Sequence, residues 1–432
     1  MRNILRKSGF FALLLLIAAG LQAQESPDRI SLSLAEAKQY AIDHNRTLAN
    51  ASIDIKKAQA NKWKAIAALL PQVTASGSYT NMMGYKMDLG QMQISMPPYA
   101  TFGLQTAVGF SGASIIGIQV AKISGRMSDI TLEKTEKQIC DQVETLYYSA
   151  LVAERTIGLL EQNLESMRKL HGITQKSVDV GVAEQTDADQ LLVQVATMAS
   201  TINTTRNSLE MVYNSLRLQL CMEDDAQIVL TDGLDDLMNM ETARALLTEE
   251  FDINRNYDYR LLKENTELTR KQIALTAWSA GPTLSIYHQL SGRHNFSNEP
   301  TMNMTPPNQI GAQLSIPLFT SGKTYASVKD ARLAYDKQLN TLEDTELSLY
   351  VQHHQLVYDL SSAIEKYEIQ KQNMEVAQRV FDNIARKYEQ GVASSLDVTN
   401  SGTNLLTAQS SYVQTLLEII TAQVALEQLL NK

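Results

Sequence analysis

The residue types that could carry out a reaction are present, but their spacing does not form a catalytic site. The segment Gly109-Phe110-Ser111-Gly112 superficially resembles a nucleophile elbow. It lacks the glycine at the required spacing, it falls in a predicted strand, and no His and Asp partners are evident. We therefore expect no catalytic residues, no enzymatic activity and no cofactor.

Two groups of potential metal ligands are also poor candidates for a site. Thioethers can bind copper(I), and a predicted surface loop is rich in methionine, which would suggest metal export. The loop contains Met82, Met83, Met87, Met92 and Met96. Flexible loop methionines are the alternative explanation, and we favour it. His353 and His354 are adjacent in a predicted helix, so they point to different faces and cannot chelate well. We expect no metal site.

One long helical segment organises the rest of the chain. Lys323–Gln390 contains no glycine and no proline, so nothing interrupts a helix of roughly 100 Å at ~1.5 Å per residue. Its apolar residues recur in a heptad rhythm, as in a coiled-coil seam. The two columns are Leu339, Leu360, Tyr367, Met374, Phe381 and Tyr388, and Leu342, Leu349, Leu356, Ala363, Ala377 and Ile384. Gly391 ends this helix, and an apolar stretch from Leu396 to Leu430 returns along it, which predicts a long helical hairpin.

The other predicted elements follow one plan twice. In the first half, a capping box at Ser33 and Glu36 opens a helix that continues to about Leu70. It is followed by strands over 72–80 and 102–111 with a loop over 81–100 between them, then by a helix over 120–179, a tip at Val180-Gly181-Val182 and a return helix to residue 220. The second half has a helix that ends at Gly281-Pro282, strands over 284–290 and 309–318 with a polar loop between them, and the long hairpin.

Matching landmarks indicate an internal duplication with a period of roughly 210 residues, which is too long for a solenoid unit. They are Asn45 with Asn256, Pro71 with Pro282, Gly103 with Gly311, Gly181 with Gly391, and Asp187 with Asp397. We divide the chain into a signal peptide (1–23), a first structural repeat (24–222), an acidic and irregular equatorial linker (223–242) and a second structural repeat (243–432). We expect the two copies to fold together, each forming half of a single structure.

The predicted strands are suited to a membrane. Each is about the ~9–11 residues needed to cross a bilayer with tilt. Their outward faces are too apolar for water, and four strands cannot close a barrel without leaving open edges, which lipid does not tolerate. Three chains would supply twelve strands, within the range of known membrane barrels. The sequence therefore predicts a mixed α/β membrane protein in which a homotrimer shares one barrel in contact with outer-membrane lipid.

The N-terminal residues predict export from the cytoplasm. The N-terminus carries three positive charges, at Arg2, Arg6 and Lys7, followed by an apolar run from Phe10 to Leu21. A small residue, Ala23, then marks the expected cleavage site, and this order is typical of a cleaved secretory signal peptide. That run is too short to span a bilayer as a helix. The formal net charge of −9 argues against nucleic acid as a partner.

Together these features resemble the TolC-like outer-membrane channels of efflux and type I secretion systems, over essentially the whole mature chain. The resemblance is carried by Ser33-Leu34-Ala35-Glu36 through Asn45, Leu70-Pro71-Gln72-Val73, the bend at Pro317-Leu318-Phe319, the two Gly-Val tips, Lys387-Tyr388-Glu389-Gln390-Gly391 and Leu396-Asp397-Val398. It implies a trimeric twelve-stranded outer-membrane β-barrel that continues into a long periplasmic α-helical coiled-coil barrel. It further implies a passive exit duct that docks a periplasmic adaptor (a membrane fusion protein) and, through it, an inner-membrane pump.

The resemblance also implies a gate at the helix tips. Tyr388 and Asp397 would line a constriction, with three Asp397 carboxylates in a ring around the axis, and Thr186 and Asp187 would be their partners in the first hairpin. The tips expected to meet the adaptor are Gly181, Val182, Gly391 and Val392. Two positions depart from the family pattern, because the second ring aspartate is Asn400 here and the gate arginine is Ala393. Capping of a helix N-terminus is the alternative role for Asp397, and packing in the seam is the alternative for Tyr388.

A periplasmic coiled-coil scaffold or adaptor without a pore is the rival function. A scaffold has no need of apolar outer strand faces. An adaptor would carry one hairpin flanked by compact β domains, rather than two hairpins and four separate strands.

The two cysteines lie at almost equal sequence distances from the first tip. Cys140 precedes Gly181 and Cys221 follows it, so in an antiparallel hairpin the two cysteines lie at similar distances from the tip along the hairpin axis. The oxidising compartment would allow a disulfide. However, neither residue points along the seam where the two helices meet, so we predict free thiols.

Overall fold

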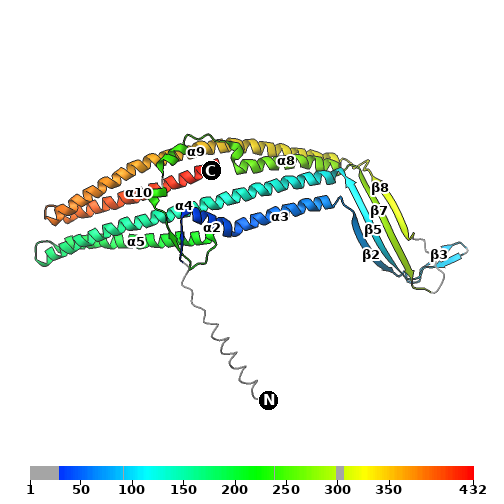
Figure 1. Ribbon diagram of the computed structural model, residues 1–432, viewed down its shortest axis with the longest axis horizontal. Helices are drawn as coiled ribbons and strands as arrows, with labels where there is room; N and C mark the ends of the chain where they lie inside the picture. The colour runs from blue at the N-terminus through cyan, green and yellow to red at the C-terminus, as the bar shows by residue number, and fades with distance from the viewer. Residues whose placement is uncertain (1–28, 91, 238, 298–305) are drawn as a thin grey trace, which may run out of the picture. The chain divides into compact units, whose positions relative to one another are not determined.

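Long helices and one four-stranded antiparallel sheet make up the chain in the computed structural model (Figure 1). The structure describes residues 29–90, 92–237, 239–297 and 306–432, so the predicted signal peptide lies outside the described residues. The helices are α2 (Leu34–His44), α3 (Arg46–Ala67), α4 (Gly112–Asp179), α5 (Gln185–Leu220), α6 (Leu234–Leu237), α7 (Met240–Leu246), the 3-10 helix η1 (Ile253–Arg255), α8 (Tyr257–Trp278), α9 (Lys323–Glu389) and α10 (Ser395–Leu430). The strands are β1 (Arg29–Leu32), β2 (Gln72–Thr80), β3 (Lys86–Leu89), β4 (Met92–Ser95), β5 (Tyr99–Ser111), β6 (Gln227–Leu230), β7 (Thr283–Asn295) and β8 (Asn308–Ser315).

The chain forms two compact units, and both halves of the sequence contribute to each. The first unit comprises residues 1–45, 139–247 and 359–424, and the second comprises residues 46–138, 248–358 and 425–432. Helices α4 and α9 supply their C-terminal parts to the first unit and their N-terminal parts to the second. The two predicted repeats are therefore interleaved in space.

The first unit contains both predicted helical hairpins. α4 turns at Gly181 into α5, and α9 turns at Gly391 into α10, as the sequence predicts. The seams of the two hairpins meet in a single core that contains Leu160, Leu164, Met167, Leu170, Leu191, Met198, Ile202, Phe381, Val398 and Leu405. The heptad pattern is therefore confirmed close to the tips. Farther along α9, Leu339 is exposed, because α10 has 36 residues against the 67 of α9 and cannot accompany its N-terminal part.

Close contacts fix how the two hairpins fit together. A Cβ atom added to Gly402 on α10 would lie 2.1 Å from Cε of Met167 on α4, so a larger residue would require the Met167 side chain to move. Asn163 Nδ2 on α4 donates to Gln409 Oε1 on α10 at 2.5 Å, and both side chains are buried. A buried polar pair of this kind is satisfied in only one alignment, which specifies the register of the helices.

The first predicted helix is wrong in one respect, because it breaks at Asn45 instead of continuing to Leu70. The capping box of Ser33 and Glu36 is confirmed. At Asn45 the backbone becomes extended, and the buried side chain donates from Nδ2 to the backbone carbonyl of Gln219 at 2.9 Å. This bond ties the break in the helix to the C-terminal end of α5.

The same arrangement recurs in the second unit. Asn256 also has an extended backbone, and its Nδ2 donates to the backbone carbonyl of Leu429 at 3.4 Å. Gln219 and Leu429 are each the residue before the last one of their helix. The Oδ1 of Asn256 additionally caps α8 by accepting from the N–H groups of Asp258 and Tyr259.

The acidic segment 223–242, expected to be irregular, contains β6, α6 and the first residues of α7. β6 pairs in parallel with β1, and neither strand was predicted. Tyr147 of α4 secures this pair, since its buried hydroxyl lies 3.0 Å from the carbonyl oxygen of Leu32 and 3.1 Å from Asp232 Oδ2. Burial raises the pKa of Tyr147, so the phenol stays protonated.

The second unit contains the sheet, whose strand order is β2-β5-β7-β8 with every pair antiparallel (Figure 1). The prediction of four strands in two pairs is confirmed, and β2 has the predicted bounds. Helix α4 begins directly after β5 at Gly112 rather than near Val120. β7 continues to Asn295, into the predicted polar loop, and β8 ends at Ser315, before the predicted Leu318.

The methionine-rich segment 81–100 is not the plain loop that we predicted. Within it, β3 and β4 form an antiparallel hairpin that turns at Gly90, which has a φ of +71°. Short strands of this kind lack a long alternating pattern, so the sequence gives little indication of them.

Ion pairs join α4 to α8 in the second unit. Arg126 contacts Glu264 at 2.6 Å and Glu267 at 3.0 Å, and Arg260 contacts Glu133 at 2.8 Å. These side chains are partly exposed, so each pair contributes little to stability by itself.

Two further observations concern the described residues. Cys140 and Cys221 form no disulfide, as predicted. Among the described residues, no helix is both long enough and apolar enough to cross a membrane.

Replacing Asn45 with alanine should destabilise the protein, because the partly buried carbonyl of Gln219 loses this donor. We expect the free energy of unfolding to fall by about 1–2 kcal/mol. Urea unfolding followed by circular dichroism measures this change. Asn50→Ala, at an exposed position of α3, is the matched control. Equal stability of the two variants would contradict the role given to Asn45.

Candidate functional site

Both helical hairpins turn through the same backbone motif. Gly181 and Gly391 have φ angles of +75° and +72°, in the left-handed region that favours glycine. The N–H of Val182 donates to the carbonyl of Ser177 at 2.8 Å, and the N–H of Val392 makes the equivalent bond with the same length. This is the Schellman motif, which satisfies carbonyl groups at a helix end. The two valine side chains are 80% and 73% exposed, so each tip presents an apolar side chain on a defined turn.

Asp397 lies in the first turn of α10 and forms a capping box with Ser394. Its Oδ2 accepts from the N–H of Ser394 at 2.9 Å and from Ser394 Oγ at 2.8 Å, while its own N–H donates to Ser394 Oγ at 3.2 Å. The hydrogen bonds from Ser394 lower the pKa of Asp397. Because the folded-state pKa is lowered, the stabilisation is present above the unfolded-state pKa and is lost as pH falls through the folded value. The carboxylate is exposed, so it can also meet ions in solution.

Asp187 has the corresponding position in α5 but makes a different contact. The N-cap of α5 is Glu184, whose side chain makes no capping hydrogen bond. Asp187 Oδ1 instead accepts a hydrogen bond from Oγ of Ser395, at the start of α10. Ser395 is buried. The two tips therefore differ, because one aspartate caps its own helix and the other connects the two hairpins.

Tyr388 makes a second connection between the hairpins. Its ring packs against the core of the first unit, and its hydroxyl lies 2.6 Å from Oγ1 of Thr174 on α4. The Thr174 hydroxyl donates to the carbonyl of Leu170 at 2.8 Å, so Tyr388 is the donor in the bond between the two hydroxyls. Beside it, Lys169 Nζ lies 2.7 Å from Glu389 Oε1.

The structure divides the predicted gate residues into two groups. Asp187 and Tyr388 are engaged in contacts between the hairpins. Thr186, Asp397 and Asn400 are exposed, and Ala393 is half-buried. Sequence reasoning did not identify Thr174, Ser394 or Ser395. The Ser394–Asp397 spacing fits a capping box and could have indicated that pair, whereas no sequence pattern indicates the contacts of Thr174 and Ser395.

The sheet of the second unit has two chemically different faces. Side chains alternate along each strand, and the strand register brings many exposed apolar residues onto one face, with Thr106 and His288 among them. They are Val73, Tyr79, Phe102, Leu104, Phe110, Leu284, Ile286, Leu290, Ile310 and Leu314. The opposite face contains Gln72, Thr74, Ser76, Ser78, Thr101, Gln105, Ser285, Gln289, Gln309 and Gln313. An exposed apolar surface of this extent indicates contact with a membrane or a partner.

Both edge strands of the sheet have a neighbour on one side only. β2 pairs with β5, and β8 pairs with β7, as far as the described residues extend. The backbone groups along the other side of each edge strand are available for a further strand.

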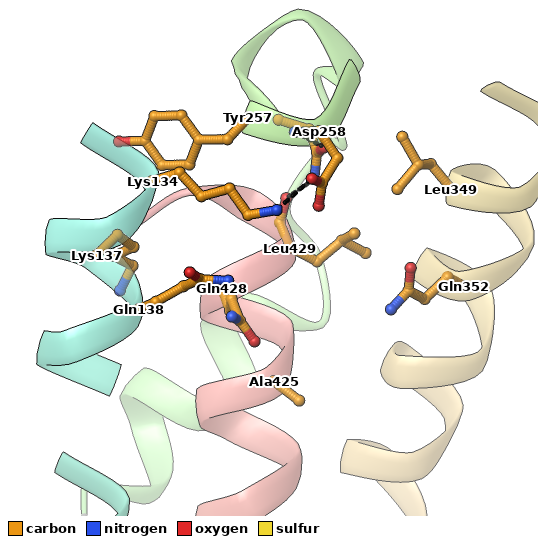
Figure 2. A pocket seen from close by; sticks show the side chains of 11 residues that line it. Lys134, Lys137, Gln138, Tyr257, Asp258, Leu349, Gln352, Ala425, Gln428 and Leu429 are labelled. Carbon is orange, nitrogen blue, oxygen red and sulfur yellow. Dashed lines mark hydrogen bonds and ion pairs between the residues drawn. The ribbon is translucent and has the colours of Figure 1, made fainter. Parts of the chain in front are cut away.

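A cavity of about 160 Å³ lies in the second unit between residues of α4, α8, α9 and α10. Figure 2 shows the side chains that line it. An ion pair between Lys134 and Asp258 lies at its edge, and its other lining side chains are mainly amides and aliphatic groups. The lining includes no serine, cysteine or histidine, so it offers no nucleophile with an adjacent base. Within the described part of the chain, no three His, Cys, Asp or Glu side chains are placed to hold a metal ion.

Comparisons with known proteins agree with this architecture. The family model for outer membrane efflux proteins matches residues 38–220 and 254–432. The chain is 22% identical to the outer membrane protein TolC of Salmonella enteritidis, over 87% of this chain and 77% of TolC. It is also 22% identical to the pyoverdine export outer membrane protein OpmQ of Pseudomonas aeruginosa, over 91% of this chain and 84% of OpmQ.

The fold has close counterparts among solved structures. A structure of CusC, from work on its folding and transmembrane channel formation, superposes with a TM-score of 0.77 at 14% sequence identity. The match covers 95% of both chains. The two matched ranges together cover most of the chain, so this chain belongs to the family of outer membrane efflux proteins.

Proposed function

We propose that three copies of this chain form an outer-membrane exit duct that completes an efflux or type I secretion pathway. The duct is passive, and a pump in the inner membrane supplies the energy. The observation that carries this proposal is the four-stranded sheet, which combines an exposed apolar face, a polar face and two edges open to further pairing. Membership of the outer membrane efflux protein family supports it.

The sheet explains why a trimer is required. In lipid, each unpaired backbone group costs several kcal/mol, so a spanning sheet must close on itself. Four strands are too few, and twelve strands from three chains give a barrel of ordinary size. In that barrel the apolar face contacts outer-membrane lipid and the polar face lines the lumen.

The helical part extends into the periplasm as a coiled-coil barrel. Residues 24–222 and 243–432 are two copies of one ancestral unit, joined by the acidic linker 223–242. The paired bonds of Asn45 and Asn256 support this duplication, because each ties the start of a copy to the penultimate residue of its last helix. Residues 1–23 are the signal peptide that directs export and is then removed.

The helix tips form the gate of the duct. Asp397 is exposed at the start of α10, and three copies around the axis make a negatively charged ring next to Asn400 and Thr186. Asp187 and Tyr388 hold the two hairpins of each chain together, through Ser395 and Thr174. With Ala393 in place of an arginine, these hydroxyl-mediated contacts and the ion pair between Lys169 and Glu389 hold the two hairpins together at the tips.

The tips also dock a periplasmic adaptor, which connects the duct to its pump. Gly181 and Gly391 allow the helices to end in tight turns, and Val182 and Val392 are exposed there. Apolar side chains on compact turns suit contact with the ends of other helices.

The trimer can be tested at one edge of the sheet. Ser291 N–H donates to the carbonyl of Pro307, so by alternation the N–H of Ala312 on β8 faces the open edge. Ala312→Pro should leave the sheet of each chain intact and weaken trimers, because proline removes a donor that the neighbouring chain needs. Native mass spectrometry in detergent measures the oligomeric state. Ala312→Val, which keeps the N–H, is the control, and a stable pore-forming monomer of the unmodified protein would contradict the proposal.

The charged ring predicts cation preference. Asp397→Asn should lower the preference of the channel for potassium over chloride, measured as the reversal potential across a planar bilayer in a KCl gradient. Asp382→Asn, at an exposed position on α9, is the control. An unchanged reversal potential in Asp397→Asn would exclude the ring.

The pH dependence of this preference tests the role of Ser394. Its hydrogen bonds lower the pKa of Asp397, so the carboxylate stays charged to a lower pH than an ordinary aspartate. Ser394→Ala should move the loss of cation preference to higher pH. Repulsion among three carboxylates acts in the same direction as this substitution, because it raises at least one pKa.

The docking role of the tips can be tested by export in cells. Gly391→Val should abolish export and leave trimers in the outer membrane, because a β-branched residue disfavours the left-handed turn. Val392→Asp keeps that turn and places a charge at the contact, so it should also abolish export. Complementation of a deletion strain, with trimers quantified in outer-membrane fractions, provides the measurement. Normal export by Val392→Asp would refute the assignment of the tips.

A further inference from the structure

Arg293 stands out on the sheet because of its charge. Across the described residues of β2, β5, β7 and β8, it is the only Lys, Arg, Asp or Glu. The other polar side chains of these strands are those of serines, threonines, asparagines, glutamines, three tyrosines and two histidines. Among the described residues of these four strands no carboxylate compensates this charge, so Arg293 contributes strongly to the electrostatic potential of the sheet.

The strand register assigns Arg293 to the polar face. It pairs with Thr101 of β5, which pairs in turn with Ser78 of β2, so the three side chains form a row across the sheet. The hydroxyls of Ser78 and Thr101 lie 2.7 Å apart. Because β7 starts next to α8 and Arg293 is near its C-terminal end, this row lies at the end of the sheet remote from the helices.

The guanidinium group is held in place by two contacts. Its Cζ lies 3.8 Å from the centre of the Tyr99 ring, a short cation–π distance. Its Nε donates to Asn295 Oδ1 at 2.9 Å. Among the residues that the structure describes, neither Nη group has a hydrogen-bond partner. Arginine thus keeps donors suited to bind a carboxylate or phosphate in a forked geometry.

We propose that Arg293 is an anion-binding site in the lumen near the outer end of the sheet, and that it makes this part of the duct favour anionic solutes. The assignment rests on the proposed function, because the polar face must line the lumen and three copies must surround one axis. The site binds carboxylates and phosphates through the Nη groups, with the hydroxyl row beside it. A solute that has passed the ring of negatively charged Asp397 side chains at the helix tips then meets positively charged Arg293 side chains near the outer end of the barrel.

Direct binding tests the site without requiring a functional pore. Isothermal titration of the detergent-solubilised protein with inositol hexakisphosphate, a compact polyanion, should show saturable binding that weakens as salt rises. Arg293→Gln should weaken the binding at least about tenfold, because charge-assisted hydrogen bonds are lost. Arg293→Lys keeps the charge but loses the two parallel hydrogen-bond donors of the guanidinium group. Its affinity for inositol hexakisphosphate should therefore lie between those of the unmodified protein and Arg293→Gln. Arg270→Gln, at an exposed position on α8, removes the same charge and should bind like the unmodified protein.

Channel block locates the site in the lumen. In planar bilayers, the polyanion should reduce the current from one side only, and Arg293→Gln should raise the half-blocking concentration by a similar factor. Equal binding by the unmodified protein and Arg293→Gln would overturn the proposal. Binding that depends on Arg293 but causes no block would contradict the lumenal position. A monomeric, non-conducting protein that still binds through Arg293 would refute the proposed duct and leave the anion site in place.

Discussion

Backbone hydrogen bonding at the edges of the sheet is the constraint on which the proposed assembly depends. The chain supplies four strands whose inner pairs are complete, while β2 and β8 each have one side unpaired. The adjoining face is apolar and exposed, so water is an unfavourable surrounding for it. Lipid is favourable for that face but leaves the edges unsatisfied. In the proposed assembly, association of chains through their edges resolves both problems.

Regular patterns made much of this fold predictable. Three features were predictable from the sequence: the heptad seam of α9, the glycines at the tips and the alternation in β2. The seam stayed recognisable although His353 interrupts its apolar pattern, because the pattern repeats along many residues. The resemblance to a known family rested on the same segments. The break at Asn45, the β1–β6 pair and the β3–β4 hairpin were missed, because each depends on contacts between distant parts of the chain or on very short strands.

The gate residues illustrate the same limit. Sequence position alone made Asp187 and Asp397 equivalent, and both lie in the first turn of a helix. Their contacts differ because the N-cap residue differs. Ser394 can both donate to and accept from the residue in the third helical position, whereas a glutamate in that place cannot donate. A difference in one neighbouring residue thus converts a helix cap into a contact between hairpins.

The asparagine bonds have a consequence for the order in which the chain can fold. Asn45 and its acceptor Gln219 lie at the two ends of the first half, and Asn256 and Leu429 lie at the two ends of the second. Each half therefore brings its two ends together, and the asparagine bond is one of several contacts between them. A chain that folds from its N-terminus can bring the ends of the first half together before the second half is present. Its apolar seam then stays partly exposed until α9 and α10 are added, because the seams of both hairpins meet in one core, and exposed apolar surface of this kind favours aggregation.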